Sequence, residues 1–245
     1  MKYFLTSLAV GLILSADAQF PQQGGCVVTF NLGNQLEICS SQNVFVLPSG
    51  SPAGGVYSGT GVLDDLFFPS IAGPGQHIIT YSYDNGFCIG TAQDTITVVT
   101  PQPIVLDGDF EICEGDVTTI TASNATDIEW STNTMGETVE LAPAFTTIYS
   151  VSGYDENFCI TSEDFTVVVN GLPDVVISGN SDICPDQSTE LIAFGAEDYV
   201  WSTIQFTDVI VVSPQSNMSV CVTGTDGNGC ESTDCIEIIL HENPE

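Results

Sequence analysis

Hydrophobic and polar residues alternate along this chain in short runs that turn-forming residues separate. Residues 117–122, 139–141, 147–152 and 164–169 alternate in this way or are rich in β-branched residues, which is typical of β-strands. Glycine, asparagine and aspartate stand between the runs, as expected of hairpin turns. Beyond Ala18, no segment has the length and period of a helix. The pattern predicts an all-β protein built from small antiparallel β-sandwiches.

One set of residue types occurs twice in the chain with identical spacing between its members. The first set is Cys113, Trp130, Pro143, Gly153, Asp155, Asn157 and Cys159, and the second is Cys184, Trp201, Pro214, Gly224, Asp226, Asn228 and Cys230. A looser copy precedes them, with Cys39 and Cys88 as its outer cysteines and Tyr57 in place of the tryptophan. A fixed period of this kind indicates one structural unit repeated in tandem.

The repeats predict three tandem modules, at residues 24–101, 102–172 and 173–245, and the first is of a divergent type. Each module would be one small antiparallel β-sandwich with an aromatic ring in its core. The predicted core aromatic residues are Trp130, Trp201 and Tyr57. Because the linkers between modules are short and contain proline, they favour a semi-rigid string of modules.

The segment from Met1 to Ala18 has the features of a secretory signal. Lys2 is followed by an apolar run at 8–14 and by Ala16-Asp17-Ala18. This run is too short for a permanent membrane helix, and no other segment is long and apolar enough. We therefore expect a secreted or cell-surface protein that does not insert into a membrane.

The charge of the chain is strongly one-sided. It has one lysine or arginine against 32 aspartate and glutamate residues, which gives a formal net charge of −31. Lys2 is that basic residue and leaves with the signal, so the mature chain has no lysine or arginine to pair with an acid. Its field repels phosphate backbones, which excludes nucleic acid as a partner. An acidic surface is otherwise typical of a soluble extracellular protein.

Nine cysteines in an exported chain predict disulfides. Equivalent positions of a repeat are expected to pair alike. The predicted bridges within modules are Cys39–Cys88, Cys113–Cys159 and Cys184–Cys230. Each would close most of its module and stabilise it by roughly 3 to 4 kcal/mol.

The third module has one further pair of cysteines, Cys221 and Cys235. Strand alternation places both on the exposed face of one hairpin, so we expect them to bridge neighbouring strands. Cys26 is then left over, as a free thiol or a link between two chains.

Metal binding and catalysis have weaker signals. Asp107, Asp109 and Glu111 cluster after a module junction and could bind calcium, although such acids are also ordinary turn residues. No other cofactor is expected. His77 and His241 are the two histidines, and with no lysine or arginine beside them the sequence predicts that the protein is not an enzyme.

Two alternatives remain open. A carbohydrate-binding array would stack sugar rings on exposed aromatic residues such as Tyr57, Tyr154 or Tyr199. A hydrolase would need two converging carboxylates, as glycoside hydrolysis does, and no such acid pair stands out in the sequence.

Several short segments, in this order, resemble a known family. They are Ile-Cys-Glu-Gly at 112–115, Thr-Ile-Thr-Ala at 119–122, Glu-Trp-Ser at 129–131 and Phe-Cys at 158–159. This pattern resembles the immunoglobulin-like (Ig-like) or PKD-like repeats of secreted Bacteroidota surface proteins, and the first module resembles a companion repeat type. The resemblance implies stalk or adhesin modules, some of them involved in gliding motility and many exported by type IX secretion.

The chain departs from that family in two respects. The second cysteine of each module lies at a hairpin turn, so its bridge differs from the core disulfide of antibody domains. The chain also stops at Pro244-Glu245, where Pro173 would begin another module, without the basic sorting domain usual for such cargo. Either the chain is a fragment of a longer surface protein or another mechanism retains it, and we favour the fragment. The sequence does not identify its ligand, which would be a surface glycan or a protein.

Overall fold

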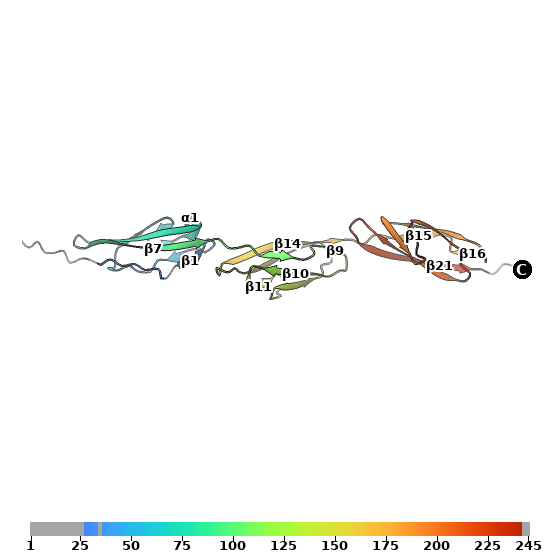
Figure 1. The fold of residues 1–245 in the computed structure, drawn as a ribbon, viewed down its shortest axis with the longest axis horizontal. Helices are drawn as coiled ribbons and strands as arrows, with labels where there is room; N and C mark the ends of the chain where they lie inside the picture. The colour runs from blue at the N-terminus through green and yellow to red at the C-terminus, as the bar shows by residue number, and fades with distance from the viewer. Residues whose placement is uncertain (1–26, 34–35, 242–245) are drawn as a thin grey trace, which may run out of the picture. The chain divides into compact units, whose positions relative to one another are not determined.

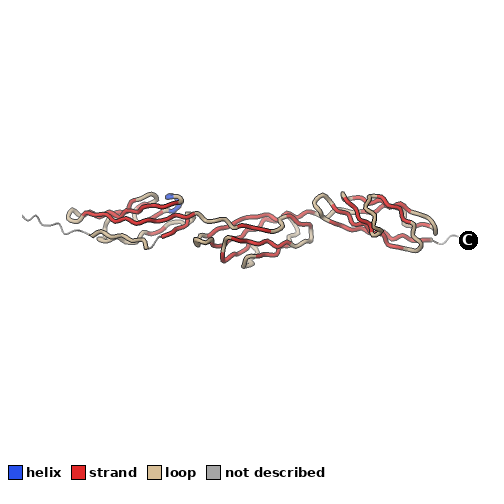
Figure 2. Tube along the Cα trace, in the orientation of Figure 1, coloured by secondary structure: helices blue, strands red, loops and turns tan. Residues whose placement is uncertain are grey.

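A computed structural model describes residues 27–33 and 36–241 of the chain. Almost every regular element in it is a β-strand, as the colouring of Figure 2 shows. The chain divides into two compact units, residues 1–100 and 101–245. The predicted signal at residues 1–18 and Cys26 lie outside the described residues.

The first unit holds one sandwich of two sheets. The larger sheet has the order β1 (Leu36–Cys39), β7 (Ile89–Val99), β6 (Gly75–Asp84) and β3 (Val56–Ser58), and the smaller has β2 (Phe45–Val46), β5 (Leu66–Phe67) and β4 (Val62–Leu63). One four-residue helix, α1 (Pro69–Ala72), interrupts the strands. It begins with proline, which suits the first helical position, and ends at Gly73, which has a positive φ of 79°.

The core of this unit contains a tyrosine other than the predicted one. Tyr81 on β6 is 2% exposed, whereas Tyr57 is only partly buried. The two residues are directly opposite in the ladder between β3 and β6, with ring centroids 4.8 Å apart. Because β3 is an edge strand and β6 an inner one, the inner residue is covered more completely. Tyr57 instead lies at the core margin, where its hydroxyl donates to the carbonyl of Pro48 at 2.6 Å.

The second unit holds two sandwiches with the same arrangement of strands (Figure 1). The first comprises β8 (Val105–Asp107), β9 (Glu111–Cys113), β10 (Thr118–Ser123), β11 (Thr126–Trp130), β12 (Thr138–Leu141), β13 (Thr147–Tyr154) and β14 (Ile160–Asn170). The second comprises β15 (Val176–Gly179), β16 (Asp182–Ile183), β17 (Thr189–Phe194), β18 (Asp198–Trp201), β19 (Val209–Val212), β20 (Met218–Thr225) and β21 (Glu231–Leu240). Below, residues 102–172 are called module 2 and residues 173–245 module 3.

Each module packs a three-stranded sheet against a four-stranded one. The sheet orders are β12-β10-β8 and β11-β13-β14-β9 in module 2, and β15-β17-β19 and β16-β21-β20-β18 in module 3. Most pairs are antiparallel, as predicted, but β9 pairs in parallel with β14, and β16 with β21. A short parallel strand therefore closes one edge of each larger sheet, next to the residue where its last strand ends.

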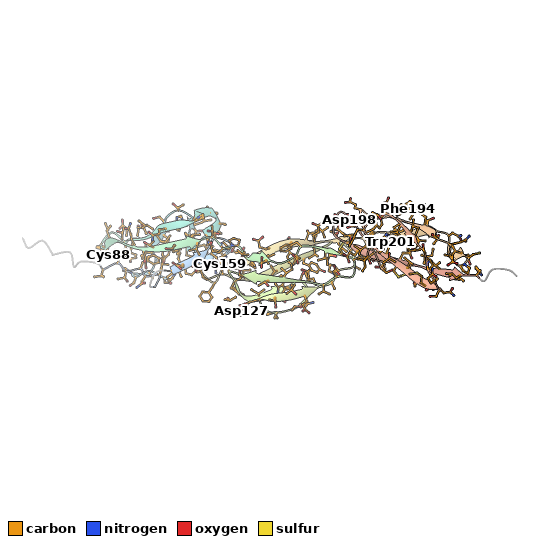
Figure 3. The ribbon with its side chains drawn as sticks, turned by 45° about the vertical axis from the view of Figure 1, so that its right-hand side comes forward. Cys88, Asp127, Cys159, Phe194, Asp198 and Trp201 are labelled. Carbon is orange, nitrogen blue, oxygen red and sulfur yellow. A yellow bond between two sulfur atoms is a disulfide. The ribbon has the colours of Figure 1, made fainter. Side chains whose placement is uncertain are left out.

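The two tryptophans fill equivalent places in separate cores. Trp130 and Trp201 are each 2% exposed, as predicted for core rings, and Trp201 is labelled in Figure 3. Trp130 Nε1 donates to the carbonyl of Gly136, and Trp201 Nε1 donates to that of Thr207, both at 2.8 Å. Because Gly136 and Thr207 are also equivalent positions in sequence, the repeat extends to the hydrogen bonds of its core side chains.

Candidate functional site

The first cysteine of module 2 lies beside the point where the chain leaves the module. Cys113 is the last residue of β9 and is opposite Asn170, the last residue of β14. The next residue of the chain hydrogen-bonds there as well, because the Glu114 N–H donates to the Asn170 carbonyl at 2.8 Å. Cys113 therefore marks the C-terminal end of module 2.

The second cysteine of module 3 lies in a hairpin turn at the opposite end of its module. Cys230 follows β20 and precedes β21. The Asp226 carboxylate accepts the N–H groups of Asn228 and Cys230, both at 2.9 Å, which fixes the turn. A Cβ placed on Gly224, at this end of β20, would lie 2.7 Å from a methyl of Val175, so the hairpin packs against the first residues of module 3.

A disulfide joins these two positions. Cys113 and Cys230 are bonded, with their Cα atoms 5.6 Å apart and a sequence separation of 117. The bridge links the end of module 2 to the start of module 3, beside residues 171–175, which connect β14 to β15. It overturns the predicted Cys113–Cys159 and Cys184–Cys230 pairs, because the bond crosses between modules instead of closing one.

The length of a β-strand explains why the predicted pairs do not form. Cys159 immediately precedes β14, and Cys113 pairs with the last residue of that eleven-residue strand. At roughly 3.3 Å per residue the two cysteines are about 35 Å apart. A disulfide tolerates a Cα separation of only about 7 Å. Cys184 and Cys230 are kept apart by β21 in the same way.

The cysteines of the first unit obey the same geometry. Cys39 is opposite Val99 at the end of β7, and Cys88 immediately precedes β7, which has eleven residues. They are therefore not each other's partner, and the predicted Cys39–Cys88 bridge is wrong. Both are nevertheless disulfide-bonded, as is Cys159, which is fully buried.

The other three cysteines of module 3 have simpler outcomes. Cys221 and Cys235 are opposite in the ladder between β20 and β21, and they form the predicted hairpin bridge, with Cα atoms 4.0 Å apart. Cys184 had been predicted to be bonded and is a free, half-buried thiol. Module 2 has Ser150 opposite Asp164 at the positions of the bridge, so the bridge is an addition to a shared hairpin.

A buried carboxylate fastens the start of module 2. Asp155 is 2% exposed and accepts three backbone N–H groups, from Gln102 at 2.8 Å and from Asn157 and Cys159 at 2.9 Å. Burial alone would raise the pKa of Asp155, but these three donors outweigh it and hold the pKa below its ordinary value. The repeat indicated a turn residue here, and it gave no sign of the bond to the linker at Gln102.

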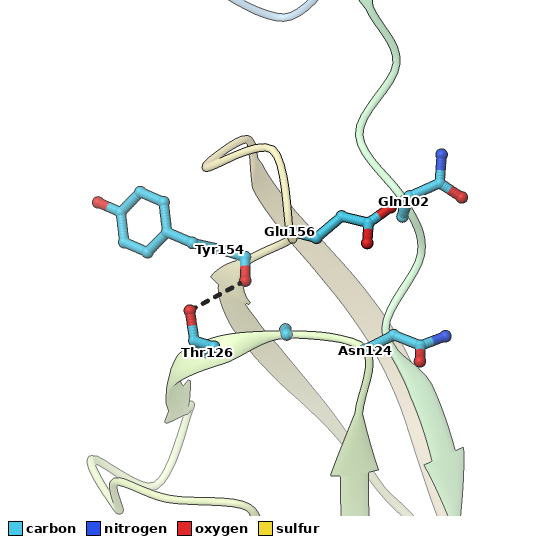
Figure 4. Close-up of a pocket in the computed structure, with 6 residues that line it drawn as sticks. Gln102, Asn124, Thr126, Tyr154 and Glu156 are labelled. Carbon is cyan, nitrogen blue, oxygen red and sulfur yellow. Dashed lines mark hydrogen bonds between the residues drawn. The ribbon is translucent and has the colours of Figure 1, made fainter.

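An open depression lies next to this turn (Figure 4). It is lined by Gln102, Asn124, Ala125, Thr126, Tyr154 and Glu156. The Thr126 hydroxyl donates to the Tyr154 carbonyl at 3.3 Å, which ties β11 to β13 beneath it. The Tyr154 side chain is 40% exposed and contacts no other aromatic ring among the described residues.

The predicted sugar-stacking tyrosines do not all present free rings. Tyr199 is 9% exposed, and its hydroxyl donates to the Ala196 carbonyl at 2.9 Å. Tyr57 is partly buried against Phe30. Of these three tyrosines, only Tyr154 offers an exposed ring.

The three acids predicted to bind calcium lie on the surface, and two of them take part in separate hydrogen bonds. Asp107, Asp109 and Glu111 are all exposed, and Glu111 accepts a hydrogen bond from the Asn170 side chain at 2.9 Å. The Asp109 carbonyl accepts the hydroxyl of the buried Thr118 at 2.8 Å. Within residues 27–33 and 36–241 no group of three such side chains could hold a metal ion, so calcium binding stays a prediction.

One histidine contacts a backbone carbonyl and the other an exposed carboxylate. His77 Nε2 is 2.7 Å from the carbonyl oxygen of Gly73. His241 Nε2 is 2.7 Å from an oxygen of Asp182, and this hydrogen bond lowers the pKa of the exposed Asp182 carboxyl. His77 thus fastens the loop at Gly73 to β6, and His241 fastens the segment after β21 to β16. In the described part of the chain, no helix is both long and apolar enough to cross a membrane.

Comparison with known proteins gives similarity of fold only. No protein-family model matches the chain, and no curated protein does. Among solved structures, a 1.5-MDa bacterial ice-binding adhesin matches 91% of this chain and 100% of that chain, with 12% identity and a TM-score of 0.37. The insect immune protein hemolin matches 89% and 76%, with 12% identity and a TM-score of 0.32.

The outer capsid protein Hoc of bacteriophage RB49, in its three N-terminal domains, matches 56% of this chain with 16% identity and a TM-score of 0.33. The match covers 59% of that chain, so this protein spans less than two thirds of the length of the three Hoc domains. TM-scores this low assign neither a family nor a function. The class defined by the sheets themselves is an all-β protein of Ig-like sandwiches.

Proposed function

We propose that this chain is a non-catalytic, extracellular array of Ig-like modules that acts as a stalk or adhesion protein on a bacterial cell surface. The observation that carries the proposal is the Cys113–Cys230 disulfide. It joins two folded modules beside their short linker, where it limits rotation of one module against the other. A protein that holds a binding surface away from a cell benefits from such stiffness.

The chemistry of the chain supports an extracellular location. Disulfides form and persist in oxidising compartments, and this chain has seven described cysteines in disulfides. The predicted signal at residues 1–18 and the acidic composition agree with export. The resemblance to Bacteroidota repeats favours a bacterial surface protein, and the partner would be a surface glycan or a protein, since the charge disfavours nucleic acid.

The stiffness is tested by the distance between two labelled modules. Fluorophores are attached through non-cysteine chemistry at Glu140 on β12 and Glu190 on β17, both exposed. Energy transfer in single molecules then reports the distribution of the distance. We expect one narrow distribution for the oxidised chain and a broad one for the Cys113→Ser, Cys230→Ser variant.

The matched control is the Cys221→Ser, Cys235→Ser variant, which also loses one disulfide but keeps the bond between modules. Its distribution should stay as narrow as that of the unaltered chain. Equal distributions in all three proteins would contradict a stiffening role for the bridge. Surface location is tested separately, by antibody labelling of intact cells that produce the full chain, and labelling of lysed cells alone would contradict the proposal.

A further inference from the structure

The free thiol of module 3 occupies the position that a bonded cysteine occupies in module 2. Cys184 directly follows β16, as Cys113 ends β9, and each lies at the end of the parallel edge strand of its larger sheet. The turn after each cysteine is also the same. The Asp116 N–H donates to the Cys113 carbonyl at 3.0 Å, and the Gln187 N–H donates to the Cys184 carbonyl at 3.2 Å.

The last strand of each larger sheet also ends beside the cysteine, because β14 ends opposite Cys113 and β21 ends opposite Ile183, the residue before Cys184. The hydrogen bonds there differ, since the Glu114 N–H donates to the Asn170 carbonyl, whereas Pro185 at the equivalent position has no N–H and the His241 N–H donates to the Ile183 carbonyl at 3.0 Å. Cys184 therefore lies at the C-terminal end of module 3, where Cys113 lies in module 2. The two cysteines differ in their bonding, since Cys113 is bonded to the hairpin cysteine of the following module and Cys184 is free.

The Cys113–Cys230 bond also indicates which kind of residue pairs with a cysteine at this position. Cys230 is presented by a hairpin whose aspartate accepts the N–H groups two and four residues later. The hairpin of Asp155 in module 2 presents Cys159 with the same two bonds. The partner of Cys113 is thus a cysteine on a hairpin turn of this kind, at the start of the following Ig-like module.

We infer that Cys184 is the attachment point of a further module of the same kind, joined in tandem to module 3. The inference rests on the proposed stalk function and extends it, because each bond of this type would stiffen one more junction. The occupant is the hairpin cysteine of that module, and the resulting bond repeats the Cys113–Cys230 bond one module later.

Bond formation needs an oxidant, which is a small disulfide such as oxidised glutathione. The Cys184 thiolate attacks one sulfur of the oxidant, forms a mixed disulfide and releases one glutathione thiolate. The hairpin cysteine of the added module then attacks the Cys184 sulfur and releases the second glutathione. Overall, two protein thiols become one disulfide, and one oxidised glutathione becomes two reduced molecules.

The test extends the full chain by one module. A copy of residues 173–241 replaces Pro244 and Glu245, so that its proline stands in register with the repeat, and its own copy of Cys184 is changed to serine. After folding with oxidised and reduced glutathione, thiols are alkylated and disulfides mapped by non-reducing mass spectrometry. We expect Cys184 to be bonded to the copied Cys230 and to resist alkylation.

The control is the same extended chain with the copied Cys230 changed to serine, in which Cys184 should be alkylated. The copied Cys221–Cys235 bond reports that the added hairpin has formed. A formed hairpin with Cys184 still alkylated would overturn the inference, and so would a Cys184–Cys184 bond between two chains on a non-reducing gel. Either result would leave the Cys113–Cys230 bond and the distance test of the stalk function unchanged.

Discussion

The backbone N–H of Gln102 donates a 2.8 Å hydrogen bond to the buried carboxylate of Asp155. Asp155 closes the hairpin between β13 and β14, whereas Gln102 lies at the start of module 2, so one side chain fastens both. The equivalent residues of module 3 are Asp226 and Pro173, and proline has no N–H to donate. The same aspartate therefore holds one more bond in module 2 than in module 3.

This difference predicts unequal effects of the same substitution. Asp155→Ala should lower the free energy of unfolding of module 2 by about 2 to 3 kcal/mol, since buried N–H groups lose a charged acceptor. Asp226→Ala should cost module 3 about 1 kcal/mol less, because one bond fewer is lost. Urea unfolding followed by the fluorescence of Trp130, in a Trp201→Phe background, measures module 2. The Trp130→Phe background measures module 3, and equal losses would contradict the role assigned to Gln102.

The lowered pKa of Asp155 predicts a pH dependence of stability. Because the pKa of Asp155 is lower in the folded chain, the carboxylate stabilises the fold most fully at pH values above the ordinary pKa of an unfolded aspartate. That contribution is lost as the pH falls through the lower, folded pKa. The other acids have no lysine or arginine partner and repel one another as they ionise, which acts in the opposite direction.

The comparison must therefore isolate Asp155. Asp155→Asn keeps an oxygen acceptor but does not titrate. The difference in unfolding free energy between the unaltered chain and Asp155→Asn should shrink as the pH is lowered from 5 to about 2. A difference that stays constant over this range would show that the carboxylate charge does not contribute.

The sequence identified the repeat, the all-β class and the buried tryptophans because each depends on local alternation and on fixed spacing. The same alternation placed Cys221 opposite Cys235, since both cysteines lie on one hairpin. It failed for Cys113, whose partner depends on where the ends of an eleven-residue strand lie. Pairing by equivalence assumed that both cysteines of a module are near each other, and β14 keeps them at opposite ends.

The core tyrosine of the first unit was missed for a related reason. Tyr57 and Tyr81 are opposite one another, and their sequences do not show which strand is at the edge of the sheet. Strand order is set by packing between distant segments, which the sequence does not show. The prediction used the spacing from Cys39 and therefore selected Tyr57, the ring on the edge strand. The bond between Asp155 and Gln102 spans 53 residues, and no repeat pattern could indicate it because module 3 has proline at that place.

A glycine shared by both modules marks a close approach of strands. A Cβ on Gly224 would lie 2.7 Å from the Ala196 Cβ and 2.7 Å from a methyl of Val175. Gly224→Ala should therefore lower the unfolding free energy of module 3 by about 1 to 3 kcal/mol, as overpacking does. The control Gly171→Ala faces open space and should change it by less than about 0.5 kcal/mol.

A second variant tests whether the close contact is the cause. Adding Ala196→Gly to Gly224→Ala removes one of the two contacts and should restore part of the lost stability. Urea unfolding followed by Trp201 fluorescence measures all these variants. A double variant less stable than the sum of its two single changes would rule out steric crowding.

The hairpin turns of modules 2 and 3 differ at one residue with a left-handed backbone. Phe158 has a φ of 58° and Gly229, its equivalent, a φ of 82°. Side chains other than glycine are strained there, and Phe158 is 82% exposed, so its ring contributes little burial in return. Phe158→Gly should raise the unfolding free energy of module 2 by about 1 kcal/mol.

Phe158→Ala separates the backbone from the ring, because alanine removes the ring but keeps the Cβ that causes the strain. It should give no gain in urea unfolding followed by Trp130 fluorescence, whereas Gly229→Ala should destabilise module 3 by about 1 kcal/mol. If Phe158→Ala stabilised module 2 as much as Phe158→Gly, removal of the exposed ring would be the cause. If neither did so, the backbone conformation of this turn would cost the module nothing.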